Sequence, residues 1–172
     1  MIKIYLGCDL FTEGQRWQAK EIQKSIEERL GDKVEIYNPA DNLEINDKEA
    51  GFASGTDILL ADYARLRESD YLIALMDTYD LGLAAEMGIA WERNIPIYQL
   101  YTDIRLTGND RTDKFDEMRK DIFQNDFLYI NKLVTGLAYV NKDGKVHDKA
   151  TIFKNREALV EAIIEDISTN NN

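Results

Sequence analysis

Cysteine, histidine and proline are scarce in this sequence. Its 172 residues include one cysteine, Cys8, one histidine, His147, and two prolines. A single cysteine excludes an internal disulfide, and one cysteine with one histidine is too few for a Cys/His zinc site. We therefore expect a fold that needs no cross-link and a protein that holds no metal.

Long apolar runs are missing as well. The longest mostly apolar stretches are far shorter than the ~20 residues that a membrane-spanning helix requires. Residues 1–5 predict a strand and lack the pattern of a signal peptide. We expect a cytoplasmic protein that does not associate with membranes.

Basic residues are outnumbered by acidic ones. The chain carries 21 Lys and Arg against 32 Asp and Glu, a net charge of −11. Such a field opposes binding to the phosphate backbone of DNA or RNA, so no nucleic-acid polymer is expected as a partner. The length is sufficient for one domain over residues 1–172 that buries roughly 70% of its unfolded surface. The polar tail, 169–172, is expected to fray.

Apolar segments alternate with helical patterns along most of the chain. This order predicts a doubly wound, mostly parallel, flavodoxin-like α/β sheet with helices on both faces. Strands are expected at 2–7, 34–37, 71–76 and 96–101, and helices at 12–30, 57–67, 83–92, around Phe115, Met118 and Ile122, and after Asn155.

Polar residues and glycines mark the ends of these segments. Thr12 and Gln15 form a capping-box pattern before the first helix, Gly31 ends it, and Asn155 can cap the last helix. A long polar loop is expected over 39–56 and a mobile excursion over 102–112. Asp143-Gly144 predicts a turn between short strands.

Two carboxylates lie in an otherwise apolar stretch. Residues 80–91 contain Asp80 and Glu86 as their only polar side chains. A helix this apolar has little solvated face, so we expect Glu86 to point into a cavity or across a subunit boundary. Its place near the helix start should favour the ionised form, which suits a nucleophile or base.

A third carboxylate, Asp62, recurs at helical spacing with Ile58 and Leu66, on the stripe expected to face the core. Asp80 follows the third strand, at the carboxyl edge where α/β folds bind ligands. We expect Asp62, Asp80 and Glu86 to surround one pocket. Taken singly, either aspartate could equally be a cap or a solvated residue.

Other chemistry is disfavoured. The Gly7-Cys8-Asp9 segment follows the first strand, but it lacks the G-x-G-x-x-G pattern, and Asp9 would repel a phosphate. Dinucleotide binding is therefore not expected, and no cofactor is implied. Cys8 has no histidine near it in sequence, and His147 follows a predicted turn, so we expect a solvated histidine and no Cys/His nucleophilic pair.

These residues resemble the motifs of a known family. The pattern Asp80-x-Gly82-x-x-x-Glu86-x-Gly88 is similar to the signature of nucleoside 2-deoxyribosyltransferases, enzymes that exchange the base of a 2'-deoxynucleoside. Further matches run along the chain in the same order: Ile4-Tyr5-Leu6-Gly7 with Phe11-Thr12, then Pro39-Ala40-Asp41-Asn42, then Ala61-Asp62, and finally Ile130 to Gly136 with Asn131.

The resemblance implies a role for each matched residue. Glu86 corresponds to the nucleophile, Tyr5 to the tyrosine that holds it, and Asp62 and Asp80 to acids that contact or protonate the departing base. The substrate-binding positions that it implies are Phe11, Asp41, Asn42, Gly82 and Asn131.

The resemblance further implies that Asn131 comes from a neighbouring subunit to the sugar 5'-hydroxyl, and hence a homo-oligomer with a shared active site. Two departures stand out. Leu43 replaces a glutamine that contacts the base in some members, and Lys132 replaces an apolar residue. The base preference is therefore left open.

The predicted function is transfer of a 2-deoxyribosyl group between nucleobases through a covalent intermediate on Glu86, with 2'-deoxynucleosides and free nucleobases as small-molecule partners. A carboxylate on one side stabilises the positive charge that develops on the sugar, and an acid on the other side neutralises the negative charge that develops on the base. Two alternatives remain: hydrolysis of 2'-deoxynucleoside 5'-monophosphates, and a non-catalytic nucleotide-binding module.

Overall fold

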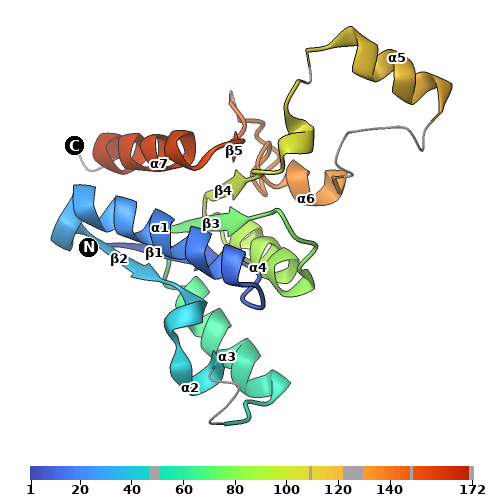
Figure 1. Ribbon diagram of the computed structural model, residues 1–172. Coiled ribbons are helices and arrows are strands. Elements are labelled where there is room, and N and C mark those ends of the chain that lie inside the picture. Colours follow the sequence, from blue (N-terminus) through green and yellow to red (C-terminus); the bar gives the residue numbers. More distant parts are fainter. Residues whose placement is uncertain (47–50, 109, 122–129, 148, 171–172) are drawn as a thin grey trace.

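Five parallel strands form one sheet in the order β2-β1-β3-β4-β5 (Figure 1). The computed structural model describes residues 1–46, 51–108, 110–121, 130–147 and 149–170. This strand order is the flavodoxin-like one, which confirms the predicted fold class. The strands are β1 (Ile2–Gly7), β2 (Val34–Tyr37), β3 (Tyr71–Leu75), β4 (Ile97–Leu100) and β5 (Ile152–Phe153).

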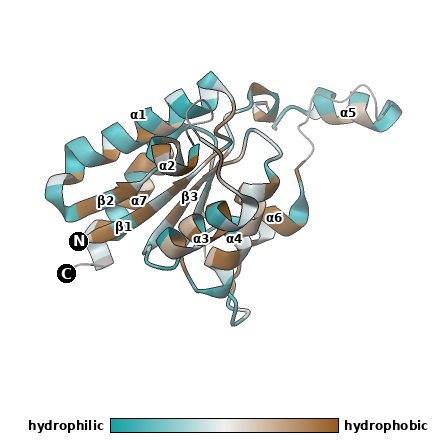
Figure 2. Ribbon diagram, turned by 90° about the horizontal axis from the view of Figure 1, so that it is seen from below, coloured by the Kyte–Doolittle hydropathy of each residue, from teal (hydrophilic) through white to brown (hydrophobic). Residues whose placement is uncertain are grey.

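Helices cover both faces of the sheet. On one face, α1 and α7 share a buried core with the strands, and on the other α3, α4 and the short α6 do so. The strands are mostly apolar, and the exposed sides of the helices are more polar (Figure 2). The helices are α1 (Glu13–Leu30), α2 (Leu43–Asn46), α3 (Gly55–Leu66), α4 (Leu81–Glu92), α5 (Thr112–Lys120), α6 (Lys132–Gly136) and α7 (Arg156–Asn170), with 3-10 turns at Gly31–Lys33, Pro39–Asp41 and Ile104–Leu106.

The pleat of β1 decides which side chains reach the site. Successive residues of a strand point to opposite faces. Ile4 and Leu6 therefore pack against α1 and α7, whereas Tyr5 packs with the α3 and α4 side. The phenol of Tyr5 consequently faces the helix that carries Glu86.

The first helix begins and ends where the sequence predicts. The Gln15 N–H donates to Thr12 Oγ1 at 3.3 Å, and Gly31 ends α1 with a φ of 53°. The reciprocal half of the capping box is not made, because the buried Oε1 of Gln15 has no donor among the described residues. At the other end of the chain, Asn155 Oδ1 caps α7 by accepting from the Ala158 N–H, as expected.

The expected long loop over 39–56 is shorter than predicted. It contains a 3-10 turn and α2, and α3 begins at Gly55 because Ser54 and Asp57 form a complete capping box. The fifth strand is an addition to the prediction. The turn at Asp143-Gly144 lies between Val140 and Val146, which form a single antiparallel bridge.

The α5 segment stands apart from the sheet (Figures 1 and 2). It forms the helix expected around Phe115 and Met118, while Ile122 lies outside the described residues. Across the described ranges, no helix combines the length and apolar character needed to cross a bilayer.

Candidate active site

A hydrogen bond joins the first strand to the fourth helix at the centre of the site. The Tyr5 hydroxyl donates to Glu86 Oε1 at 2.7 Å. Tyr5 is 0% exposed, so its ring is fixed by packing and its hydroxyl has little freedom to turn elsewhere. The carboxylate of Glu86 is thereby held in one orientation.

Burial controls the protonation of Glu86. It raises the pKa of this carboxyl to about 7, with the charges of Asp62 and Asp80 adding to the rise and the Tyr5 hydrogen bond opposing it. The sequence suggested that the helix dipole would favour the ionised form. Glu86 instead lies in the second turn of α4, where the dipole is weak, and desolvation prevails.

The three carboxylates lie around one cavity, as the sequence predicts. This cavity, of about 160 Å³, is called the Glu86 cavity below. Asp62 reaches it from α3, Asp80 from the N-cap of α4 and Glu86 from the first half of α4. Its other described walls are Cys8, Leu10, Phe11, Pro39, Asn46, Ile58, Gly82 and Leu83.

Asp62 is tied to the end of β2. The Tyr37 hydroxyl donates to Asp62 Oδ1 at 3.4 Å and accepts a hydrogen bond from Asn42 Nδ2 at 3.1 Å. Burial raises the pKa of the Asp62 carboxyl, and the hydrogen bond from Tyr37 opposes this rise. A carboxyl with a raised pKa can carry a proton at a pH where an exposed aspartate cannot.

The Asp80 side chain both caps a helix and lines two cavities. Its Oδ1 accepts from the Leu83 N–H at 2.6 Å and so caps α4. Its side chain also lines the Glu86 cavity. It lines a second cavity as well, which lies between α4 and α6. Asp80 is therefore a helix cap that also lines the Glu86 cavity.

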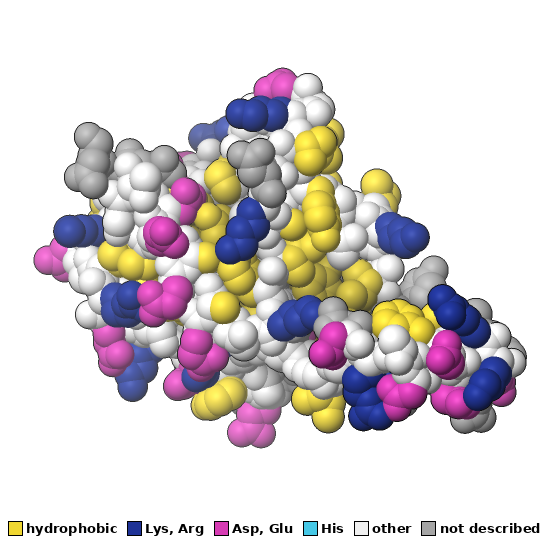
Figure 3. Space-filling model, turned by 90° about the horizontal axis from the view of Figure 1, so that it is seen from above, with side chains coloured by type: hydrophobic (Ala, Val, Ile, Leu, Met, Phe, Trp, Pro, Cys, Tyr) yellow, Lys and Arg dark blue, Asp and Glu magenta, His cyan; other side chains and the backbone are white. Residues whose placement is uncertain are grey.

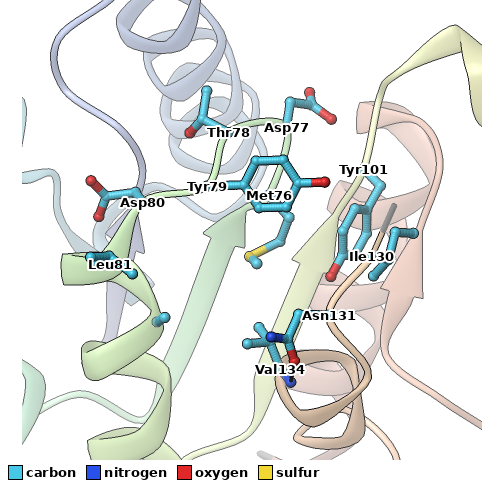
Figure 4. A pocket seen from close by; sticks show the side chains of 11 residues that line it. Met76, Asp77, Thr78, Tyr79, Asp80, Leu81, Tyr101, Ile130, Asn131 and Val134 are labelled. Carbon is cyan, nitrogen blue, oxygen red and sulfur yellow. Dashed lines mark hydrogen bonds between the residues drawn. The ribbon is translucent and has the colours of Figure 1, made fainter. Parts of the chain in front are cut away.

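Asn131 lies in that second cavity, not in the Glu86 cavity. It caps α6, with Oδ1 accepting from the Leu133 and Val134 N–H groups. Figure 4 shows Asn131 and Val134 on one side of this cavity and Asp80 at the start of α4, with its carboxylate pointing away from Asn131. Within one chain, Asn131 and Glu86 thus belong to different cavities.

The other sequence-derived positions divide into two groups. Phe11 and Gly82 line the Glu86 cavity, and Phe11 is 75% exposed at its mouth. Asp41 and Asn42 are outside the lining: the Asp41 carboxylate is 3.7 Å from Lys20 Nζ, and Asn42 contacts Tyr37. Asn42 is therefore linked to Asp62 through the Tyr37 hydroxyl.

Gly7 permits the close approach of α4 to β1. A Cβ atom at this position would lie 2.5 Å from Leu83 Cδ1 and 3.1 Å from Glu86 Oε2. A side chain at this position would force the Leu83 and Glu86 side chains to move. Gly88 differs, since a Cβ there would meet no described atom within 4 Å, so nothing described in this chain requires a glycine at 88.

Several wall residues escaped the sequence analysis. Asn46 was assigned to a polar loop, and Pro39, Leu10 and Ile58 carried no chemical signal. The end of a short helix following β2 would have been a clue for Asn46, because segments after parallel strands meet at the carboxyl edge of the sheet. Cys8 lines the cavity, but burial raises its thiol pKa to about 12. A thiol so rarely ionised is a poor nucleophile.

Metal binding has no support in the geometry. Within the described ranges, no group of three or more His, Cys, Asp or Glu side chains could hold a metal ion. His147 is exposed beyond the turn, where its backbone N–H donates to Tyr139 O at 2.8 Å.

A flavodoxin-like sheet with paired carboxylates at its carboxyl edge defines a class of enzymes that act on small ligands there. The family model described as nucleoside 2-deoxyribosyltransferase matches residues 4–118, more than half of the chain. The protein belongs to this family.

Solved structures share the fold. A conserved protein from Enterococcus faecalis V583 is 33% identical, with a TM-score of 0.83 and coverage of 96% of this chain and 99% of that one. A 2-deoxyribosyltransferase from Bacillus psychrosaccharolyticus is 19% identical, with a TM-score of 0.57 and coverage of 92% and 90%. A CMP N-glycosidase from Clostridium botulinum is 15% identical, with a TM-score of 0.50 and coverage of 95% and 98%. A search of curated proteins gave no match.

Proposed function

We propose that the protein transfers the 2-deoxyribosyl group of a 2'-deoxynucleoside to a second nucleobase. One observation carries the proposal: a buried carboxylate, Glu86, is held by the Tyr5 hydroxyl in a cavity that also contains Asp62 and Asp80. Membership of the family supports deoxyribosyl transfer or a related N-glycosidase activity.

The first half of the reaction breaks the bond between sugar and base. The Tyr5 hydroxyl donates its hydrogen bond to Glu86 Oε1, so Oε2 is the oxygen that attacks C1'. As the C1'–O bond forms and the C1'–N bond breaks, the electron pair of the latter goes to the base. Asp62, whose pKa is raised by burial, donates a proton to that base.

The second half reverses these steps with another base. A ring nitrogen of the incoming base attacks C1', Glu86 leaves as a carboxylate, and the base returns a proton to Asp62. Two displacements at the same carbon retain its configuration and give ping-pong kinetics. A 2'-hydroxyl would withdraw electrons from the oxocarbenium-like state, which favours deoxy sugars.

Neutral nucleosides fit the charges of the site better than nucleotides. The described linings of the Glu86 cavity and the second cavity contain acidic side chains and no Lys or Arg. A phosphate placed there would meet carboxylates instead of donors. The protein therefore favours nucleosides over 5'-monophosphates.

Product analysis with thymidine and adenine distinguishes the candidate activities. Formation of deoxyadenosine is expected and establishes transfer. Free deoxyribose without deoxyadenosine would instead establish a hydrolase, and repeating the assay with thymidine 5'-monophosphate would identify a nucleotide hydrolase. Ligand binding without turnover, unchanged in Glu86→Ala, would establish a non-catalytic module.

We also propose that the active site is completed by a second copy of the chain. Asn131 does not reach the Glu86 cavity of its own subunit. Leu81 on α4 and Leu133 on α6 are 86% and 81% exposed, and Figure 3 shows hydrophobic side chains gathered on the face seen from above. Such patches mark interaction surfaces in soluble proteins.

Subunit mixing tests this arrangement. Asn131→Ala and Glu86→Ala proteins are expected to be weakly active alone and to regain activity when co-expressed, because one shared site then has both residues. A strict monomer with full activity on a sizing column would contradict the assignment of Asn131 to a neighbouring site.

A further inference from the structure

The amide of Asn46 is fixed in one orientation at the wall of the Glu86 cavity. Asn46 ends α2, and its Nδ2 donates to the Pro39 carbonyl oxygen at 2.7 Å. A backbone carbonyl can only accept, so the amide nitrogen must face it. Turning the amide over would place Oδ1 against the carbonyl oxygen and lose this bond.

This orientation leaves Oδ1 as the atom available to a ligand. Asn46 lines the cavity, and no group among the described residues donates to its Oδ1. The wall therefore offers a hydrogen-bond acceptor of fixed polarity. A ligand placed against it must supply a donor.

Asn46 and Asp62 belong to the same wall. Asn46 is bonded to Pro39 and Asp62 to Tyr37, two positions at the end of β2 that are separated by one residue. Asp80, the N-cap of α4, and Glu86, within α4, line the same cavity from a different helix. The base is expected on the Asn46 and Asp62 side, since the sugar carbon must meet Glu86.

We propose that Asn46 makes the enzyme select bases with an exocyclic amino group beside a ring nitrogen, with adenine as the best fit. This inference rests on the proposed deoxyribosyl transfer. On adenine, N7 accepts and the neighbouring N6 amino group donates. Asp62 gives its proton to N7 of a departing adenine and recovers it from N7 of an incoming one, while Asn46 Oδ1 accepts from the amino group in both directions.

The same wall rejects 6-oxopurines. Guanine and hypoxanthine present O6, an acceptor, where adenine presents N6, so Asn46 Oδ1 would face a second acceptor. Asn46 cannot adapt by turning because Pro39 holds it. A buried acceptor without a donor is costly, which is how polar sites obtain their selectivity.

Competition between two acceptor bases measures the effect. With thymidine as donor and equal adenine and hypoxanthine, we expect deoxyadenosine to form at least about tenfold faster than deoxyinosine, the worth of about one hydrogen bond. Asn46→Leu should bring this ratio near unity, because adenine loses its acceptor and hypoxanthine no longer places O6 against Oδ1. Leu60→Ala, on α3 and 60% exposed outside the lining, is the control and should keep the ratio.

The ratio separates a specificity role from a structural one. If Asn46→Leu misfolds, it loses both products together. The wild-type protein then tests the inference with purine as the acceptor base. Purine lacks the amino group and should react about as poorly as hypoxanthine. Equal wild-type rates for adenine and hypoxanthine, or a ratio unchanged in folded Asn46→Leu, would overturn the inference.

Failure of the proposed function gives a different result. If the protein hydrolyses nucleosides without transfer, the rates of hydrolysis of deoxyadenosine and deoxyinosine are compared instead. Their ratio then measures the contact between Asn46 and the base. If it has no turnover, calorimetric dissociation constants for adenine and hypoxanthine do so, with a tenfold preference for adenine supporting Asn46 and equal affinities refuting it.

Discussion

The Tyr5 hydroxyl, on the first strand, donates a 2.7 Å hydrogen bond to Glu86 Oε1, on a helix 81 residues further along the chain. The two groups act on each other in opposite directions. The negative charge of Glu86 and burial raise the pKa of the Tyr5 phenol, whereas the Tyr5 hydrogen bond lowers the pKa of the Glu86 carboxyl. Tyr5 therefore remains a donor and favours the ionised form of Glu86.

Removal of this donor should shift the pH dependence of the reaction. In Tyr5→Phe the pKa of Glu86 rises above about 7, so the acidic limb of the kcat/KM profile moves to higher pH. We expect a loss of about tenfold at pH 7 that becomes smaller in alkaline buffer. An unmoved acidic limb, or a loss exceeding that of Glu86→Ala, would contradict this role.

The buried Glu86 carboxyl should also make stability depend on pH. Its folded-state pKa of about 7 lies above its ordinary value of 4.5, so stability is full below pH 4.5 and falls as the pH rises through 7. The cost above pH 7 is on the order of 3 kcal/mol. We expect Glu86→Gln to unfold at a higher temperature than the wild type at pH 8, with the difference vanishing near pH 4.

A second carboxylate provides the control for that experiment. Glu165→Gln, on the exposed side of α7, removes one negative charge away from the site. If Glu86→Gln and Glu165→Gln changed the melting temperature equally at pH 8, burial of Glu86 would not be the source of the effect.

The contact between β1 and α4 leaves no room at Gly7. In Gly7→Ala the new Cβ would meet Leu83 Cδ1 and Glu86 Oε2, so these two side chains must move. We expect about 1–3 kcal/mol of lost stability in urea unfolding and at least about tenfold lower kcat, because Glu86 moves from Tyr5. Gly14→Ala is the matched control, since a Cβ there meets no described atom within 4 Å. Equal activity of the two variants would show that this contact is not needed.

Strong periodicity made most of the fold predictable. The four strands from β1 to β4 are mostly apolar segments, and the helix ends at Thr12, Gly31 and Asn155 follow local capping rules. β5 was not predicted because Ile152–Phe153 is too short to give a pattern. Its pairing with β4 depends on tertiary contacts that the sequence does not display.

The site was predictable where a side chain conflicts with its neighbours. Glu86 and Asp62 stand out because carboxylates on apolar helix faces are costly. Asn46 and Gly7 gave no such signal, since an asparagine in a polar segment and a glycine after a strand are ordinary. Their importance comes from contacts with Pro39 and Leu83 across folded distances.

The central claim is that Glu86 bonds to the sugar carbon, and mass spectrometry of the acid-quenched protein tests it most directly. After brief incubation with a 2'-deoxynucleoside and no acceptor base, we expect a protein mass increased by one deoxyribosyl group, located on the peptide containing Glu86. Addition of adenine should discharge it as deoxyadenosine, and Glu86→Ala should form no adduct and lose at least ~100-fold in rate. An adduct on another residue, or near-wild-type turnover by Glu86→Ala, would contradict the mechanism.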